Sequence, residues 1–275
     1  MVTTTDLVAY YKCDTDGTFV DSHASYDGTI NGATFTTDGK INGGYDYDGN
    51  NDDVDTNILN ENINDPTDTQ ASISLWFKVR SGVLPDILRI FDTQATSSGY
   101  TGLTAFFNDT NGFRVQCRTE DHRYQSDYNT SLSDDTWYHL VVTIDDSGGN
   151  EILKSYINGA LDTTTTPTSE TNTSQANRHL IIANRPVSPN APFNGIIDEI
   201  SVWNRALSEQ DITDLYNGGT GLQYPFTPTP TGTNMSINIG DVWKDVESLK
   251  INIGDSWKDV VSVKQNIGDT WKDVF

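Results

Sequence analysis

The chain has 275 residues, of which 35% are hydrophobic, enough for one substantial core plus a small appendage. Its formal net charge is −22, from 39 acidic and 17 basic residues. This balance argues against a nucleic-acid partner or docking on an anionic membrane, because both are held by Lys and Arg. No apolar run approaches the roughly 18 residues that a membrane-spanning helix needs.

Short β-branched and aromatic segments separated by turn residues predict a mostly β protein. Asn158-Gly159 is typical of a two-residue hairpin turn, and the Thr-, Ser- and Asn-rich residues 163–178 indicate an exposed loop. The predicted strands are Leu7–Tyr11, Thr29–Phe35, Gly44–Asp48, Ser72–Val79, Ile87–Phe91, Gly102–Phe107, Gly112–Arg118, His122–Tyr128, Trp137–Ile144, Glu151–Tyr156, His179–Ala183 and Gly195–Trp203.

Residues 72–79 alternate in a way that favours a central strand of a sandwich. Ile73, Leu75 and Phe77 fall on one face and Trp76 on the other, so both faces are apolar near the middle of the strand. Such a strand is expected to be covered on both sides.

The stretch from Gly195 to Gly219 predicts a strand followed by a short helix. Ser208 and Asp211 have capping-box spacing, and Ile212, Leu215 and Tyr216 follow at helical intervals. Gly218 is well placed to end the helix in a left-handed conformation.

The same stretch, GIIDEISVWNRALSEQDITDLYNGG, resembles the closing signature of laminin G-like, concanavalin A-like jelly-roll domains. Three upstream stretches are similar to motifs of that family in the same order: GGYDYDGNNDDV from Gly43, SISLWFKV from Ser72, and the Trp-x-His strand from Trp137 with its Tyr-x-Asn-Gly hairpin. The resemblance covers about residues 6–224 and implies an all-β, concanavalin A-like jelly-roll β-sandwich.

The resemblance also implies one structural Ca²⁺ between an early loop and the Asp-Glu strand. Carried over to this sequence, it points to Asp21, Asp198 and either Thr29 or Asn31. Hard cations take several oxygen ligands from loops, which these residues would supply. Alternatively, Asp198 caps a turn or pairs with Arg205, and Asp21 is simply solvated.

Catalysis is not expected, although the same fold hosts glucanases. Those enzymes place two carboxylates on one sheet face, whereas Asp198 and Glu199 are adjacent and would point to opposite faces of a regular strand. His139 is expected to be structural, and the four histidines lie far apart in the sequence. We therefore predict a protein that is not an enzyme.

Glycan binding is the remaining functional prediction for this domain. Sugars are held by aromatic rings and convergent polar groups. The candidates lie in the loop-rich middle of the chain: Tyr100, Asn108, Asp109, Arg123, Tyr124 and Tyr128. Cys13 and Cys117 lie 104 residues apart in the sequence, and their pairing is left open.

The predicted domain ends near Phe226, and residues 227–236 form a Pro/Thr-rich linker. Residues 237–275 then contain three copies of a 14-residue unit, the last truncated, with Trp243, Trp257 and Trp271 at equivalent positions. A unit of this size cannot bury its own Trp. We therefore expect a small β-repeat module that anchors the chain or assembles it into homo-oligomers.

These units resemble the short Asn-Val-Gly-Gly-x-Trp-Lys-x-Val repeats at the C-termini of tailed-phage structural proteins, with Gly-Asp in place of Gly-Gly. The resemblance implies a virion surface protein that contacts other virion proteins through residues 237–275 and displays its sandwich toward a host-surface glycan or protein. It would also account for the absence of a recognisable secretion signal at the start of this sequence. The alternative is a secreted or cell-surface bacterial lectin-like module.

Overall fold

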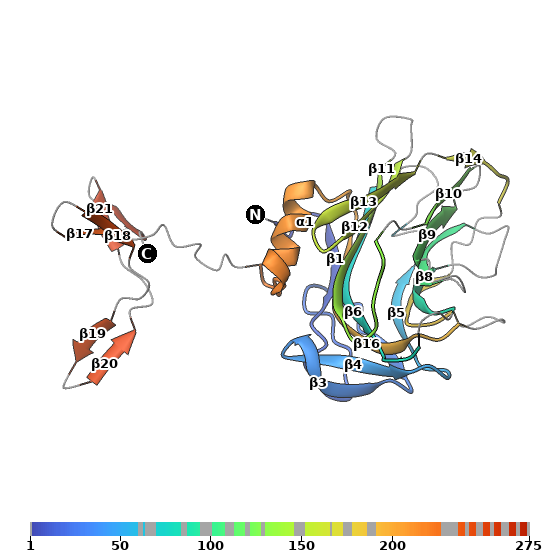
Figure 1. Ribbon diagram of the computed structural model, residues 1–275, viewed down its shortest axis with the longest axis horizontal. Helices are drawn as coiled ribbons and strands as arrows, with labels where there is room; N and C mark the ends of the chain where they lie inside the picture. Colours follow the sequence, from blue (N-terminus) through green and yellow to red (C-terminus); the bar gives the residue numbers. More distant parts are fainter. Residues whose placement is uncertain are drawn as a thin grey trace. The chain divides into compact units, whose positions relative to one another are not determined.

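The computed structural model divides the chain into two compact units, Met1–Phe226 and Thr227–Phe275. The first unit is a jelly-roll β-sandwich of two antiparallel sheets, with the helix α1 (Glu209–Tyr216) outside one of them (Figure 1). The described residues are 2–59, 63, 70–83, 87–93, 101–107, 113–118, 122–127, 130–145, 152–165, 167–172, 178–185 and 191–226, together with the backbone of six short strands between 236 and 273.

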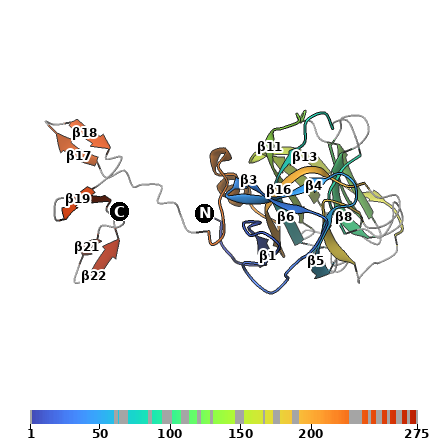
Figure 2. The ribbon, with the colours of Figure 1, turned by 90° about the horizontal axis from the view of Figure 1, so that it is seen from below.

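The first sheet has the order β13-β12-β11-β6-β16-β4-β3, with β1 also paired to β16. β16 therefore pairs with three strands, β1, β4 and β6, and Figure 2 shows β3, β4 and β16 side by side. The strands are β1 (Leu7–Tyr11), β3 (Thr34–Ile41), β4 (Gly43–Asp48), β6 (Gln70–Val79), β11 (Trp137–Asp145), β12 (Ile152–Ile157), β13 (Ala160–Thr165) and β16 (Asn194–Trp203).

The second sheet has the order β14-β10-β9-β8-β7-β15-β5-β2. Its strands β8, β9 and β10 lie on the side of the sandwich away from α1 (Figure 1). The strands are β2 (Thr29–Asn31), β5 (Asp53–Leu59), β7 (Arg89–Asp92), β8 (Gly102–Phe107), β9 (Phe113–Arg118), β10 (His122–Asp127), β14 (Thr168–Ser169) and β15 (His179–Ile182).

The core lies between the two sheets and follows the alternation of the strands. Ile73, Leu75 and Phe77 of β6 point into it, as predicted, and β8 and β9 supply Leu103, Ala105, Phe107, Phe113, Val115 and Cys117. Trp76 points to the opposite side, where its ring stacks on Tyr216 of α1 at a centroid distance of 5.8 Å. Strand β6 is therefore covered on both faces.

The helix α1 begins with the predicted capping box. The Ser208 side chain accepts a hydrogen bond from the backbone N–H of Asp211, and the Asp211 side chain accepts one from the backbone of Ser208. Ile212 and Leu215 pack in a second apolar cluster with Trp203 on the outer face of the first sheet. The left-handed turn that ends the helix begins at Asn217, one residue before the predicted Gly218.

Two predicted elements differ from the structure. Residues 29–35, predicted as one strand, form β2 in the second sheet and the start of β3 in the first sheet. Gly32, at φ +81°, lies at the switch, where a residue with a Cβ would be strained. Residues 163–178, predicted as a loop, contain the end of β13 and all of β14, because threonine fits paired strands well.

The second unit contains three separate hairpins, one from each sequence repeat. They are formed by β17 (Ser236–Ile239) with β18 (Val242–Asp245), β19 (Lys250–Ile253) with β20 (Ser256–Asp259), and β21 (Lys264–Ile267) with β22 (Thr270–Asp273). The side chains of Trp243, Trp257 and Trp271 lie outside the described part of the chain. Among the described residues, no helix is long and apolar enough to span a bilayer.

Candidate functional site

The outer face of the second sheet carries a row of side chains across six strands, five of them polar. Most apolar residues of these strands enter the core, so the residues between them face outward; Ile181 and Phe106 are apolar residues on the outer side. Strand register brings one outward residue per strand into a single row: Asp55 of β5, Ile181 of β15, Asp92 of β7, Thr104 of β8, Gln116 of β9 and Gln125 of β10.

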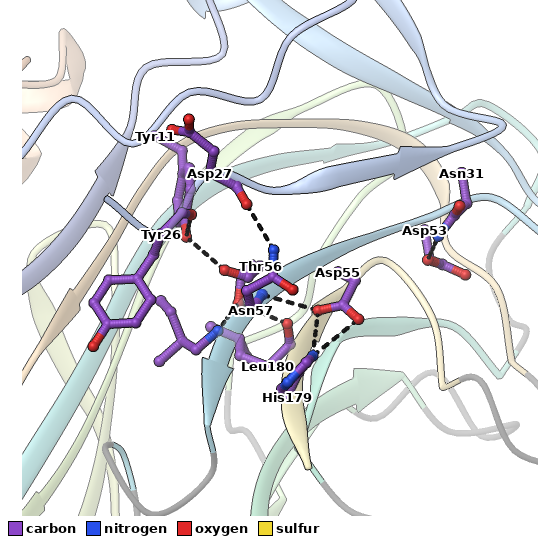
Figure 3. Close-up of polar contacts among 11 residues, drawn as sticks. Tyr11, Tyr26, Asp27, Asn31, Asp53, Asp55, Thr56, Asn57, His179 and Leu180 are labelled. Carbon is purple, nitrogen blue, oxygen red and sulfur yellow. Dashed lines mark hydrogen bonds and ion pairs between the residues drawn. The ribbon is translucent and has the colours of Figure 1, made fainter. Parts of the chain in front are cut away.

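At the β2 end this face is open and carries five polar side chains, which we call the polar strip: Asn31, Asp53, Asp55, Asn57 and His179 (Figure 3). His179 Nδ1 lies 2.8 Å and 3.0 Å from the two carboxylate oxygens of Asp55. The Asn31 side-chain amide donates a 2.8 Å hydrogen bond to Asp53. About a third of the His179 and Asp55 side chains is exposed, 34% and 33%.

The position of Asn57 is fixed by a bulge in β5. Its backbone is left-handed at φ +57°, and the β5–β15 register shifts at this point. The Asn57 amide donates a 2.8 Å hydrogen bond to the Asp27 carbonyl, and its backbone N–H donates one of 2.9 Å to Asp55 (Figure 3). The strip therefore offers oriented carboxylate, amide and imidazole groups, which can both donate to and accept from a hydroxyl-rich ligand.

Asp198, a predicted calcium ligand, is fully buried and hydrogen-bonded to backbone. Its Oδ2 accepts from the N–H groups of Lys40 and Ile41 at 2.8 Å and 2.9 Å, and its Oδ1 accepts from Glu199 N–H at 2.8 Å. Asp198 thus caps the turn between β3 and β4, which is one of the alternatives that the sequence left open. Arg205 pairs instead with Asp211, at 2.8 Å.

The other predicted calcium ligands lie in different surroundings. The Asp21 carboxylate accepts hydrogen bonds from the backbone N–H groups of Tyr10, His23 and Tyr26, at 2.9–3.1 Å. Thr29 and Asn31 lie exposed on β2. Within the described parts of the chain, no three His, Cys, Asp or Glu side chains group so as to hold a metal ion. As arranged, these residues do not fit a shared calcium site, and calcium binding stays a prediction.

Asp198 and Glu199 do not point to opposite faces of β16, as a regular strand would require. Glu199 has a left-handed backbone at φ +52°, and the register with β6 shifts between Asp198 and Ser201. Ile197 and Ile200 both reach the core, so the two acidic residues between them share the outer side. Glu199 is 4% exposed and accepts hydrogen bonds from the Tyr10 hydroxyl and, at 2.6 Å, from the Gln223 amide.

This carboxylate pair is enclosed by protein groups. Burial and the neighbouring charge of Asp198 raise the pKa of Glu199 to about 9. Burial also raises the pKa of Asp198, although hydrogen bonds from its backbone N–H donors lower it in part. His139 is equally enclosed: it is 1% exposed, and its Nε2 lies 2.9 Å from the Ser74 hydroxyl. Neither group lies on an open face.

The predicted glycan contacts are not brought together by the described structure. Tyr124 is 1% exposed and belongs to the core cluster, which contradicts its prediction as a sugar-stacking residue. Its neighbour Arg123 alternates with it and lies on the outer face. Tyr100, Tyr128, Asn108 and Asp109 lie outside the described residues. Cys13 and Cys117 are both buried and are not joined in a disulfide.

Sequence reasoning missed the polar strip, although part of its signal was present. Asp53, Asp55 and Asn57 alternate with Val54, Thr56 and Ile58, the pattern of a strand with one polar face. The strand order that places β15 and β2 on either side of β5, and so brings His179 and Asn31 to this face, is a tertiary property.

The two sheets and their strand order define a jelly-roll β-sandwich. Residues 48–213, more than half of the chain, match the family model described as the concanavalin A-like lectin/glucanases superfamily, of laminin G type. The chain belongs to this superfamily. A search among curated proteins gave no match.

Three solved structures illustrate the similarity. Domain 4 of an extracellular GH43 arabinanase from Geobacillus stearothermophilus, in complex with arabinotriose, is 21% identical at a TM-score of 0.55, covering 76% of this chain and 97% of that one. The binding domain of botulinum neurotoxin serotype D is 16% identical at a TM-score of 0.56, and the match covers 79% of this chain and 52% of that one. Trypanosoma rangeli sialidase is 15% identical at a TM-score of 0.59, and the match covers 80% of this chain and 34% of that one.

This chain therefore spans about half of the neurotoxin binding domain and a third of the sialidase. At these identities the likeness concerns the fold alone.

Proposed function

We propose that this chain is a non-catalytic carbohydrate-binding protein whose ligand lies along the outer face of the second sheet. The observation that carries the proposal is the polar strip: a carboxylate–imidazole pair and two amides, held in fixed orientations on an open face of a lectin-like sandwich. Sugar hydroxyls need this mixture of oriented donors and acceptors. Membership of the superfamily supports the same ligand class.

The proposal includes the statement that the protein does not hydrolyse the carbohydrate that it binds. Glycoside hydrolysis uses two carboxyl groups placed on either side of a bound sugar. Asp198 and Glu199 share one side of β16 but are 0% and 4% exposed and hydrogen-bonded by protein groups. A reducing-sugar assay on polysaccharides that the protein binds tests this part, and sugar release would contradict it.

A glycan-array screen of the full chain, followed by titration calorimetry, tests carbohydrate binding. We expect His179→Ala to weaken binding of the best glycan about tenfold, which corresponds to about 1.4 kcal/mol. Asp38→Ala is the matched control, because Asp38 also forms a surface ion pair, with Lys78, but lies on the first sheet. Equal effects of the two substitutions, or no glycan bound, would contradict the proposal.

The finer proposal is that the chain is a phage virion surface protein, tail-associated or capsid-decorating, that displays the sandwich for attachment to a host-surface glycan or protein. Its support is the three-fold repeat, each copy of which forms one hairpin. A single hairpin is at best marginally stable in water, so the repeats are expected to bury their Trp residues against other copies or other virion proteins. A secreted or cell-surface bacterial lectin-like module is the alternative.

The mass in solution of the full chain and of a chain ending at Phe226 tests assembly through the repeats. A multimer formed only by the full chain would support assembly through residues 237–275. If both chains are monomers, homo-oligomerisation is wrong, and the repeats are either a dock for a different protein or a passive tail.

Calcium binding is tested separately by thermal unfolding in excess Ca²⁺ and in a chelator. Because a ligand that binds only the folded state raises its stability, a structural ion would raise the unfolding midpoint. Equal midpoints would contradict the prediction.

A further inference from the structure

Arginine is concentrated on one face of this acidic chain. Five of the eight arginines in the sequence lie on or beside the outer face of the second sheet, and we call them the arginine patch: Arg89, Arg114, Arg118, Arg123 and Arg185. Arg89, Arg118 and Arg185 are buried, at 8%, 4% and 3% exposure, whereas the side chains of Arg114 and Arg123 are 27% and 39% exposed. Arg114 forms an ion pair with Asp127, so Arg123 is the accessible cation of the patch that is least tied to a carboxylate.

The inner part of the patch is built around Arg89. Its guanidinium lies 3.2 Å from the Asp92 carboxylate, donates a 2.5 Å hydrogen bond to the Thr104 hydroxyl and lies 4.2 Å from the centre of the Phe106 ring. Burial lowers the pKa of Arg89 to about 10, with repulsion from Arg185 and Arg118 acting in the same direction and Asp92 opposing them. Arg89 therefore remains a cation at neutral pH among other cations.

The outer part of the patch holds a carboxylate between two arginines. Arg118 Nε lies 3.1 Å from Glu170 Oε2, and Arg123 Nε lies 4.0 Å from the same oxygen. Arg118 also donates a 2.7 Å hydrogen bond to Gln116, whose amide donates one of 2.8 Å to Gln125. The side chains of Arg123 and Glu170 are 39% and 31% exposed, so this end of the patch is accessible.

We propose that the arginine patch binds the carboxylate of an acidic sugar, so that the ligand is a carboxylate-bearing glycan such as a uronic-acid or sialic-acid oligosaccharide. Guanidinium groups match planar carboxylates through paired N–H donors. Arg89 already pairs with Asp92 at 3.2 Å and Arg118 with Glu170 at 3.1 Å, so Glu170 marks the position that a sugar carboxylate takes.

The patch and the polar strip lie on the same face and are connected by the row from Asp55 to Gln125. Adjacent strands are about 4.8 Å apart, so a row of six strands extends roughly 24 Å. The middle of this row is covered, because Asp92, Thr104 and Gln116 are 1%, 0% and 7% exposed. An oligosaccharide would therefore contact the strip with its hydroxyls and the exposed Arg123 end of the patch with its acid group as two separate surfaces. This inference rests on the proposed carbohydrate binding and names the class of glycan.

The test measures the affinity of the full chain for matched pairs of sugars that differ in the acid group. The probes are tetragalacturonic acid against its methyl ester, and sialyllactose against lactose. We expect the acidic member of at least one pair to bind tenfold or more tightly. Arg123→Gln should remove most of this preference and leave binding of the neutral member unchanged.

Glu170→Gln removes the competing carboxylate and should strengthen binding of the acidic probe about threefold. The matched control is Arg80→Gln, because Arg80 is a similarly exposed arginine paired with Asp46 away from the second sheet. All these variants alter partly exposed side chains, so folding is expected to persist.

Each of the other possible results would overturn one part of the proposal. Equal affinity for acidic and neutral probes, or equal effects of the Arg123 and Arg80 substitutions, overturns the arginine patch while the polar strip stands. A sulfated oligosaccharide of the same length binding as tightly as the uronate overturns the choice of carboxylate. Binding of no glycan overturns this inference together with the proposed function.

Discussion

Asp198 and Glu199 lie next to each other on the outer side of the first sheet, because the left-handed backbone of Glu199 inserts a bulge into β16. Asp198 faces the backbone N–H groups of Lys40 and Ile41, and Glu199 faces the Tyr10 hydroxyl and the Gln223 amide. Two adjacent buried carboxyl groups repel when both are ionised. The pair therefore links β1, β3 and β16 at an electrostatic cost that depends on pH.

The first prediction concerns stability at alkaline pH. Burial and Asp198 raise the pKa of Glu199 from 4.5 to about 9, so the folded state binds a proton more tightly than the unfolded chain. The contribution is fully present below about pH 4.5 and is lost as pH rises through about 9. We expect the free energy of unfolding, measured by urea titration, to fall across this window, and Glu199→Gln to flatten the fall.

Glu209→Gln is the matched control for this substitution, since Glu209 is exposed on α1. If Glu199→Gln leaves the pH dependence as steep as in the parent protein, the assignment of the proton to this carboxyl group is wrong.

The second prediction concerns stability in acid. Burial, with a smaller effect of Lys40, lowers the pKa of His139 from 6.5 to about 3. The unfolded chain therefore binds a proton more tightly, and stability present above about pH 6.5 is lost as pH falls toward 3. We expect His139→Gln to weaken this loss in acid unfolding followed by tryptophan fluorescence. His122→Gln, at a half-buried position, should leave it unchanged.

The third prediction concerns Gly195, at the start of the β16 pairing with β4 and β6. Its φ is +148°, and a Cβ there would lie 2.1 Å from the Lys78 carbonyl oxygen, a backbone atom. We expect Gly195→Ala to lower the free energy of unfolding by about 3 kcal/mol or more. The measurement is the urea midpoint of the purified variant.

Gly82→Ala is the control that separates the cost of a left-handed backbone from the cost of the clash with the Lys78 carbonyl. Gly82 has φ +76°, but a Cβ there meets no atom within 4 Å. This variant should lose only about 1 kcal/mol. Equal losses at the two glycines would show that the approach of Lys78 does not matter.

The fourth prediction concerns the start of α1. The Ser208 hydroxyl accepts a 3.2 Å hydrogen bond from Asp211 N–H, and Asp211 also pairs with Arg205 at 2.8 Å. Ser208→Ala should lower the free energy of unfolding by about 1 kcal/mol. Gln210→Ala, exposed two residues later, should change it by much less. A Ser208→Ala variant as stable as Gln210→Ala would contradict the capping role.

The sequence by itself determined the elements whose signals are local. The alternation of Ile73, Leu75 and Phe77 against Trp76 predicted which face of β6 enters the core, and this is confirmed. The spacing of Ser208 and Asp211 predicted the start of α1, and Asn158-Gly159 predicted the hairpin turn between β12 and β13. Hydrophobic period and turn chemistry depend only on neighbouring residues, so they can be read directly.

Only the tertiary structure decided which distant side chains meet. His179 contacts Asp55 because β15 and β5 are neighbours in the second sheet, although the two residues are 124 positions apart. The bulge that brings Asp198 and Glu199 to one side, and the burial of Tyr124 in place of a surface position, likewise follow from sheet pairing. Strand order, register and bulges are set by packing between segments far apart in the chain, so the local pattern of residues does not contain them.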